Sequence, residues 1–286
     1  MTFFRSARAL IAAVLSGAAA LALPLTATRQ GATDLAFSGQ FVAVPKAEKR
    51  FVSHAALEAL PAVTTMRERP MPPMKEAELT VLPLEALLAE LPLAPGADGI
   101  ALRCADQWVS FYTLDFIRKW KPYVLLRHDG KRPEEGWPLL MGREPLTPYF
   151  INVPAAAAKV LTGGGEYGNF DPTQVVELEA VNTAEFFAPY YAGALAKLEG
   201  PAAAGRKIFL RQCFACHQGP GGVGGNVSQR PLAVLRIHAT LNADYFRAFV
   251  KNPKKFMPET MMPKHENFTP EMFEQLIAFL GATEGE

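Results

Sequence analysis

Apolar residues recur with two different periods along the chain, and the period changes near residue 200. In the middle of the chain, short apolar runs between turn residues predict strands at 99–104, 108–112, 123–127, 149–153 and 174–179, and short helices at 84–91 and 114–120. From Gly205 onward the spacing is helical. A last helix should begin near Thr269, which can cap it, and Pro270, which suits its first turn. The chain is therefore predicted to be an α+β protein, with a small, mainly β domain followed by an all-α domain.

The segment before the predicted strands carries a weaker pattern. Residues 64–74 include Pro70, Pro72 and Pro73, and each proline fixes φ and removes a backbone donor. We therefore expect residues 28–80 to form an extended arm or linker. The predicted domains are then 81–190 for the mainly β part and 196–286 for the helical part, and an alanine-rich, helix-prone stretch connects them.

Residues 1–27 have the layout of an export signal. Arg5 and Arg8 precede an apolar run that Pro24 ends, and this run is shorter than the roughly 20 residues that a membrane-spanning helix needs. Cleavage would give a periplasmic protein, whereas an uncleaved segment would anchor it to the inner membrane. The small residues that offer cleavage points are Ala20, Ala22 and Ala27.

Composition narrows the possible functions. The 286 residues are 49% apolar, enough for a buried core, and their net charge of +1 argues against nucleic acid as the main partner. The three cysteines do not form the even, scattered set of a disulfide framework. Cys213 and Cys216 form a close pair, and Cys104 stands alone, which favours a buried structural role for it.

The pair belongs to the sequence Cys-Phe-Ala-Cys-His at residues 213–217. Two intervening residues on a helical turn place both thiols where they can add to the two vinyl groups of a haem, and the adjacent His217 can bind the iron. A thioredoxin-like dithiol would need a surrounding βαβ pattern, and a zinc site would need a second cysteine pair. The motif therefore predicts one covalent haem c on Cys213 and Cys216, with His217 as an iron ligand.

The flanking residues extend this motif into a family resemblance. Gly205 and Phe209 before the motif, and Pro231-Leu232 and Met262-Pro263 after it, stand as in small class I c-type cytochromes. Residues 201–284 resemble that family, which implies an all-α haem domain. The resemblance also implies that the carbonyl of Pro231 accepts a hydrogen bond from His217.

The second axial ligand also follows from the resemblance. Haem iron in cytochromes c typically takes His and Met, and in this family the ligating Met stands directly before Pro. Residues 252–263 fit that pattern and put Met262 in the ligating position. The other candidates are Met257, Met261, His238 and His265.

A second resemblance concerns the N-terminal part. Residues 78–182 are similar, in a shortened form, to the β-rich fold of sulfite oxidase-type molybdopterin enzymes, through 105–109, 122–131, 142–149 and the strand near Gln174. Those enzymes supply one cysteine to molybdenum. Cys104 is the only candidate here, and it falls in a different part of the pattern. We therefore expect a docking domain, which contacts a partner or its own cytochrome domain.

Together these features predict an exported mono-haem cytochrome that transfers single electrons between redox partners, such as a dehydrogenase or an oxidase. Low-spin His/Met ligation leaves no open position for a substrate. Lysines beside the methionine segment would steer an acidic partner, namely Lys251, Lys254, Lys255 and Lys264. The alternatives are a catalytic oxidoreductase, or its haem subunit, whose N-terminal domain binds a molybdenum cofactor, and a haem sensor with a weak sixth ligand.

Overall fold

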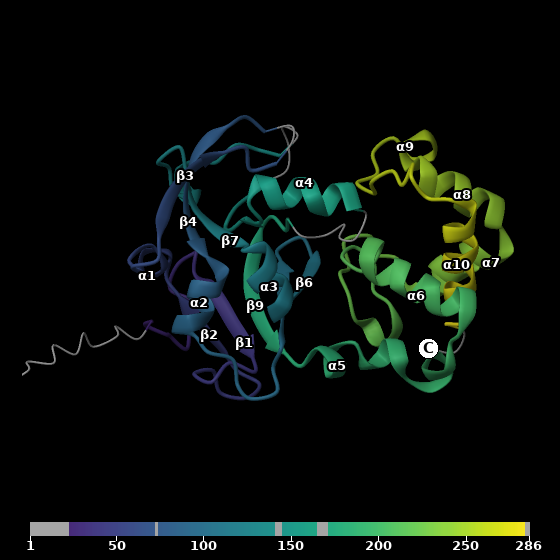
Figure 1. Cartoon of the computed structure of the whole chain (residues 1–286), viewed down its shortest axis with the longest axis horizontal. Coiled ribbons are helices and arrows are strands. Elements are labelled where there is room, and N and C mark those ends of the chain that lie inside the picture. The colour runs from purple at the N-terminus through teal and green to yellow at the C-terminus, as the bar shows by residue number, and fades with distance from the viewer. Residues whose placement is uncertain (1–22, 72–73, 141–144, 165–170, 284–286) are drawn as a thin grey trace, which may run out of the picture.

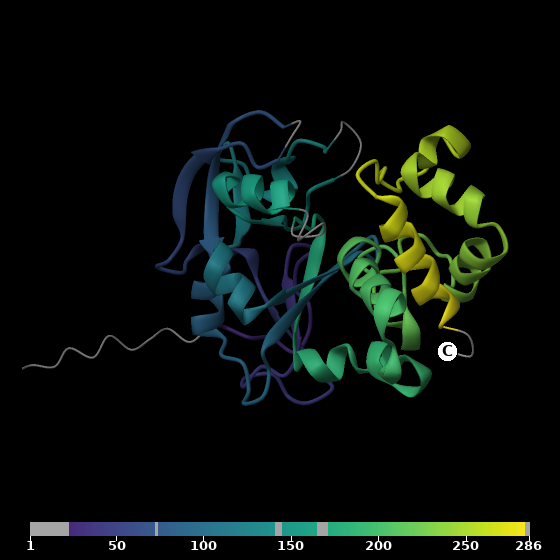
Figure 2. The same cartoon turned by 45° about the vertical axis from the view of Figure 1, so that its right-hand side comes forward.

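A sheet-rich N-terminal part and a helical C-terminal part lie side by side in the computed structural model (Figures 1 and 2). The structure describes residues 23–71, 74–140, 145–164 and 171–283. This mixed α+β architecture confirms the predicted fold class.

Two sheets build the N-terminal part. One has the strand order β2-β1-β9-β5-β6 and the other β3-β4-β7-β8; β1 and β9 pair in parallel, and the remaining neighbours are antiparallel. The strands are β1 Leu35–Gly39, β2 Lys49–Val52, β3 Thr64–Glu68, β4 Ala77–Pro83, β5 Gly99–Cys104, β6 Val109–Thr113, β7 Tyr123–His128, β8 Ile151–Asn152 and β9 Val175–Val181.

Helices cover the sheets of the N-terminal part and form the C-terminal part. The N-terminal part contains α1 His54–Glu58, α2 Leu84–Glu90, α3 Leu114–Trp120 and α4 Ala155–Gly164. The connection contains α5 Thr183–Phe186 and the 3₁₀ turns Ala188–Tyr191 and Gly193–Lys197. The C-terminal helices are α6 Gly200–Gln212, α7 Leu232–Leu241, α8 Ala243–Lys251, α9 Pro253–Phe256 and α10 Pro270–Gly281.

The predicted strands of the middle segment are present. The runs at 99–104 and 108–112 became the β5–β6 hairpin, and those at 123–127 and 174–179 became β7 and β9. The hydroxyl of Thr269 accepts a hydrogen bond from the amide of Met272, as expected for the cap of α10. Among the residues described, no helix is both long and apolar enough to cross a membrane.

The expectation of an arm or linker at 28–80 was wrong. β1 lies inside the five-stranded sheet between β2 and β9, and Leu35 and Phe37 are completely buried. The error has a physical cause: β1 pairs with a strand about 140 residues away, for example Ala36 with Glu177, so no local pattern reveals it. The proline-rich stretch does keep out of central strands, because β3 lies at the edge of its sheet.

The predicted export segment overlaps the fold at its end. Residues 1–22 lie outside the described residues. Leu23 is buried in the core of the N-terminal part, and Thr26 exchanges two backbone hydrogen bonds of 2.9 Å with Phe51. Residues 23–27, the end of the predicted export segment, thus belong to the folded N-terminal part.

Helices α6 and α10 form the main packing contact of the C-terminal part. They cross at Gly205, where an added Cβ would lie 1.8 Å from the carbonyl oxygen of Gln275. Phe209 of α6 and Phe279 of α10 are buried beside this crossing, with ring centroids 5.5 Å apart. Glycine therefore sets how closely the two helices approach.

This crossing yields a stability prediction. Gly205→Ala should lower the free energy of unfolding by about 1–3 kcal/mol, because backbone atoms of α10 must move away from the new methyl group. Gly281→Ala is the matched control: its Cβ would make an ordinary 3.5 Å contact with Thr240. Urea denaturation of the haem-loaded protein, followed by circular dichroism, measures both, and equal stabilities of the two variants would contradict the proposed crossing.

Candidate functional site

One helical turn brings the three residues of the haem motif together. α6 ends as the amide of Cys213 donates to the carbonyl of Phe209, at 2.9 Å. The amides of Cys216 and His217 then both donate to the carbonyl of Cys213, at 3.1 and 2.9 Å. Residues 213–217, called here the attachment turn, thus present two free thiols and an imidazole from a single turn.

The glycine-rich stretch after the motif packs against the attachment turn. The amide of Gly225 donates to the carbonyl of Phe214 at 2.8 Å, and a Cβ on Gly225 would lie 1.7 Å from the carbonyl oxygen of Ala215. Gly224 adopts a φ of 128°, which a residue with a side chain rarely adopts. These glycines allow two backbone segments to approach closely.

The environment of His217 suits a metal ligand. Burial, together with the neighbouring Arg230 and His265, lowers its pKa to about 4. The imidazole is therefore neutral at pH 7, as metal binding requires.

The second ring nitrogen of His217 has a partner that the sequence did not reveal. The hydroxyl oxygen of Ser228 lies 2.8 Å from Nδ1 of His217, which leaves Nε2 for an iron atom. The resemblance assigns this role to Pro231. In the structure the carbonyl of Pro231 starts α7, where it accepts from the amides of Val234 and Leu235 at 2.9 and 3.4 Å, and its role toward His217 stays a prediction.

The methionine segment distinguishes between the neighbouring ligand candidates. Met262 packs against the same apolar cluster as Cys213 and Phe214. Met261 and Met257 are 53% and 42% exposed. Met262 is thus the methionine of the three that shares the apolar surroundings of the attachment turn, and its ligation of the iron stays a prediction.

The two histidine candidates differ in their surroundings. His265 is partly buried beside the ring of Phe268, with centroids 4.7 Å apart, and burial lowers its pKa. His238 lies on α7, its ring centroid 6.1 Å from that of Tyr245. His265 is also close enough to His217 to lower its pKa, so it is the candidate that lies near His217.

The N-terminal part touches the attachment turn directly. At the start of β6, the amide of Val109 donates to the carbonyl of Ala215 in the attachment turn at 3.1 Å. In the turn between β5 and β6, residues 105–108, the carbonyl of Gln107 accepts from the amide of Asn226, in the loop that follows the attachment turn, at 2.9 Å. The side-chain nitrogen Nδ2 of Asn226 also donates to the side-chain oxygen Oε1 of Gln107, at 3.1 Å.

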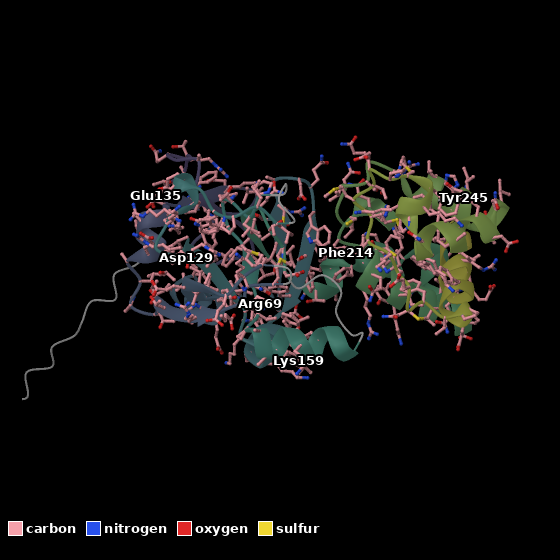
Figure 3. The ribbon with its side chains drawn as sticks, turned by 90° about the horizontal axis from the view of Figure 1, so that it is seen from above. Arg69, Asp129, Glu135, Lys159, Phe214 and Tyr245 are labelled. Carbon is pink, nitrogen blue, oxygen red and sulfur yellow. The ribbon has the colours of Figure 1, made fainter. Side chains whose placement is uncertain are left out.

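Aromatic rings continue this contact. Phe214, within the haem motif, is 3% exposed and lies where the two parts meet (Figure 3). Its ring centroid is 5.4 Å from that of Phe187 in the connection, which in turn lies 4.8 Å from Phe111 of β6. The cluster comprises Phe111, Phe186, Phe187, Tyr190 and Phe214.

The connection is packed onto the haem part. The hydroxyl of Tyr190, which is completely buried, donates to the carbonyl of Val223 at 2.8 Å. The buried guanidinium of Arg206 donates to the carbonyls of Tyr190 and Leu195 at 3.1 and 2.8 Å. The connection is therefore a folded segment that fixes the two parts relative to each other.

Cys104 lies away from the haem motif in the sequence, at the end of β5. Its thiol is 7% exposed, and burial raises its pKa well above the usual value, which makes it a poor thiolate ligand. Within the described ranges, no group of three or more His, Cys, Asp or Glu side chains could hold a metal ion.

Comparisons with known proteins agree with the haem motif. Residues 200–280 match the family described as cytochrome C oxidase, cbb3-type, subunit III, so this part of the chain is a cytochrome c domain, which implies haem c. A search of curated proteins found no match.

Among solved structures, the crystal structure of the sulfane dehydrogenase SoxCD from Paracoccus pantotrophus is similar at 14% identity and a TM-score of 0.36. The alignment covers 55% of this chain and 40% of that one.

The residues present fit a covalent haem. Two free thiols on one turn, a neutral imidazole with Nδ1 engaged, and a methionine in the same apolar cluster form the donor set of a His/Met cytochrome. The group would supply a reversible one-electron couple. The chain's own residues would hold it, orient its ligand and exclude water.

Attachment gives a direct test. Cys213→Ala, Cys216→Ala and the double variant should lose normal haem attachment, because each substitution removes one thioether. The measurement is haem staining of a denaturing gel, with Cys104→Ala as the control that should stain like the wild type. Strong staining of the double variant would rule out the assigned thiols.

Proposed function

We propose that this protein is an exported mono-haem c-type cytochrome that carries single electrons between redox proteins. The observation that supports this proposal is the attachment turn, in which one turn presents Cys213, Cys216 and a neutral His217 beside Met262. With His217 and Met262 on the iron, no position is left for a substrate, so the protein's task is to bind partners and set the potential.

The N-terminal part serves recognition in this proposal. It is held against the attachment turn by the β5–β6 turn, so its surface is continuous with that of the haem part. A redox protein that docks at this boundary would contact both parts. The lysines near α8 and α9 would favour an acidic partner, although Lys264 is already paired with Glu266 at 2.9 Å.

The second axial ligand tests the carrier role. The oxidised protein should show the weak near-infrared absorption of Met-to-iron ligation, and Met262→Ala should abolish it. Met261→Ala is the matched control, because Met261 is its exposed neighbour and should keep the band. A band that survives in Met262→Ala and disappears in Met261→Ala would transfer the role to Met261.

We also propose that export ends with cleavage between Ala22 and Leu23. Ala20 and Ala22 provide the small residues of an A-x-A site. Cleavage after Ala27 would remove Leu23, which is buried in the core, and Thr26, which pairs with Phe51.

N-terminal sequencing of the periplasmic protein should therefore give Leu23 as the first residue, because Leu23 and Thr26 are parts of the fold. A membrane-bound protein that still carries residues 1–22 would contradict cleavage. A first residue of Thr28 would contradict the chosen site.

A further inference from the structure

The loop that carries Ser228 joins the iron ligand to the N-terminal part. Ser228 donates its amide to the carbonyl of Cys216 at 3.2 Å, and its hydroxyl oxygen lies 2.8 Å from Nδ1 of His217. That oxygen also accepts from the amide of Arg230 at 3.3 Å. Ser228 is therefore fixed from three directions, and its oxygen faces the imidazole.

The other end of this loop is held by Gln107. Asn226, two residues before Ser228, bonds to Gln107 through both its backbone amide and its side-chain amide, at 2.9 and 3.1 Å. The amide of Gln229 closes the turn on the carbonyl of Asn226 at 3.1 Å. Contacts thus run without a break from Gln107 through Asn226 and Ser228 to His217.

Gln107 is itself built for this position. It adopts a φ of 72° in the connection of the β5–β6 hairpin, residues 105–108, and its amide donates to the carbonyl of Cys104 at 3.1 Å. Glycine is the usual residue at such a position, because a side chain is strained there. A glutamine whose side chain reaches Asn226 has a contact to offset that strain.

We propose that Ser228 orients the imidazole of His217 toward the iron, and that Gln107 of the N-terminal part positions the loop that carries Ser228. This inference rests on the proposed function, since it assumes that His217 binds haem iron. When Nε2 binds iron, the ring hydrogen is on Nδ1, and Nδ1–H donates a hydrogen bond to the Ser228 oxygen. The N-terminal part thereby contributes to the reduction potential of the haem.

The direction of the effect follows from the bond. A hydrogen bond accepted from Nδ1–H makes the imidazole a more basic ligand, and a more basic ligand stabilises ferric over ferrous iron. Ser228→Ala should therefore raise the midpoint potential. At fixed ambient potential, the ratio of reduced to oxidised haem should rise about tenfold, which corresponds to about 59 mV for a one-electron couple.

Spectroelectrochemical titration of the haem-loaded, full-length protein measures this shift, and proton NMR of the haem methyl groups reports the ring orientation of His217. Ser228→Thr keeps the hydroxyl and should restore both wild-type values. Thr240→Ala is the matched control, because it removes an exposed hydroxyl of the same domain that bonds only to the carbonyl of Arg236. A potential of Ser228→Ala equal to that of Thr240→Ala would overturn the role of Ser228.

Gln107→Gly tests the N-terminal contribution. It removes the side-chain bond to Asn226 while glycine relieves the strained backbone, so the fold should persist and the potential should shift in the same direction by a smaller factor. Ala47→Gly is the control, since Ala47 is an exposed residue of the same part with a φ of 62°. A midpoint potential of Gln107→Gly equal to that of the wild type would overturn the role of Gln107, even if Ser228→Ala shifts the midpoint potential.

These outcomes are separable from a failure of the proposed function. Absence of covalent haem from the wild-type protein would contradict the proposed function and would precede any titration. If Ser228→Ala does not incorporate haem, the midpoint potentials of Gln107→Gly and Ser228→Thr can still be compared with that of the wild type. Both of these variants retain a hydroxyl group beside Nδ1 of His217.

Discussion

The backbone hydrogen bonds between the β5–β6 hairpin and the haem part constrain the rest of the structure. Val109 donates to Ala215 within the haem motif, and Gln107 accepts from Asn226 in the loop after it, so the motif and this loop are both bonded to the N-terminal part. Buried backbone groups of a loop need partners. Here the sheet-rich part supplies them. The haem motif therefore belongs to both parts of the molecule.

This constraint explains why the connection is folded. A flexible linker would allow the two parts to separate and would expose Phe214, which is 3% exposed in the structure. Instead, the hydroxyl of the buried Tyr190 donates to the carbonyl of Val223, and the guanidinium of Arg206 donates to two carbonyls of the connection. Burial of an aromatic cluster and of a charged side chain that donates to two carbonyls gives a boundary that resembles a domain core more than a docking contact.

The same constraint bears on electron transfer. Cys213 and Cys216 would hold the haem on the turn whose Ala215 carbonyl accepts from the amide of Val109 in the N-terminal part. Ser228, which contacts His217, lies on the loop that bonds to Gln107 of the N-terminal part. In the proposed function, recognition and potential would therefore depend on the same contacts.

The sequence determined what a single turn or a short period can encode. Cys213, Cys216 and His217 are neighbours, so their spacing alone predicted the attachment turn, and the alternation at 99–104 and 108–112 predicted the β5–β6 hairpin. The cap of α10 at Thr269 was likewise local, because Thr269 bonds to a residue three positions away.

Tertiary structure decided what depends on residues far apart in the chain. Strand β1 lies between β2 and β9, and its pairing with β9 joins residues about 140 positions apart, so the segment had the local pattern of a linker. Nδ1 of His217 lies beside Ser228, 11 positions along the chain, a contact that the spacing of the motif does not display. Gln107 meets Asn226 across 119 positions. Such contacts form only when burial of the whole core brings the segments together, and therefore the residues that couple the two parts could not be predicted from the sequence.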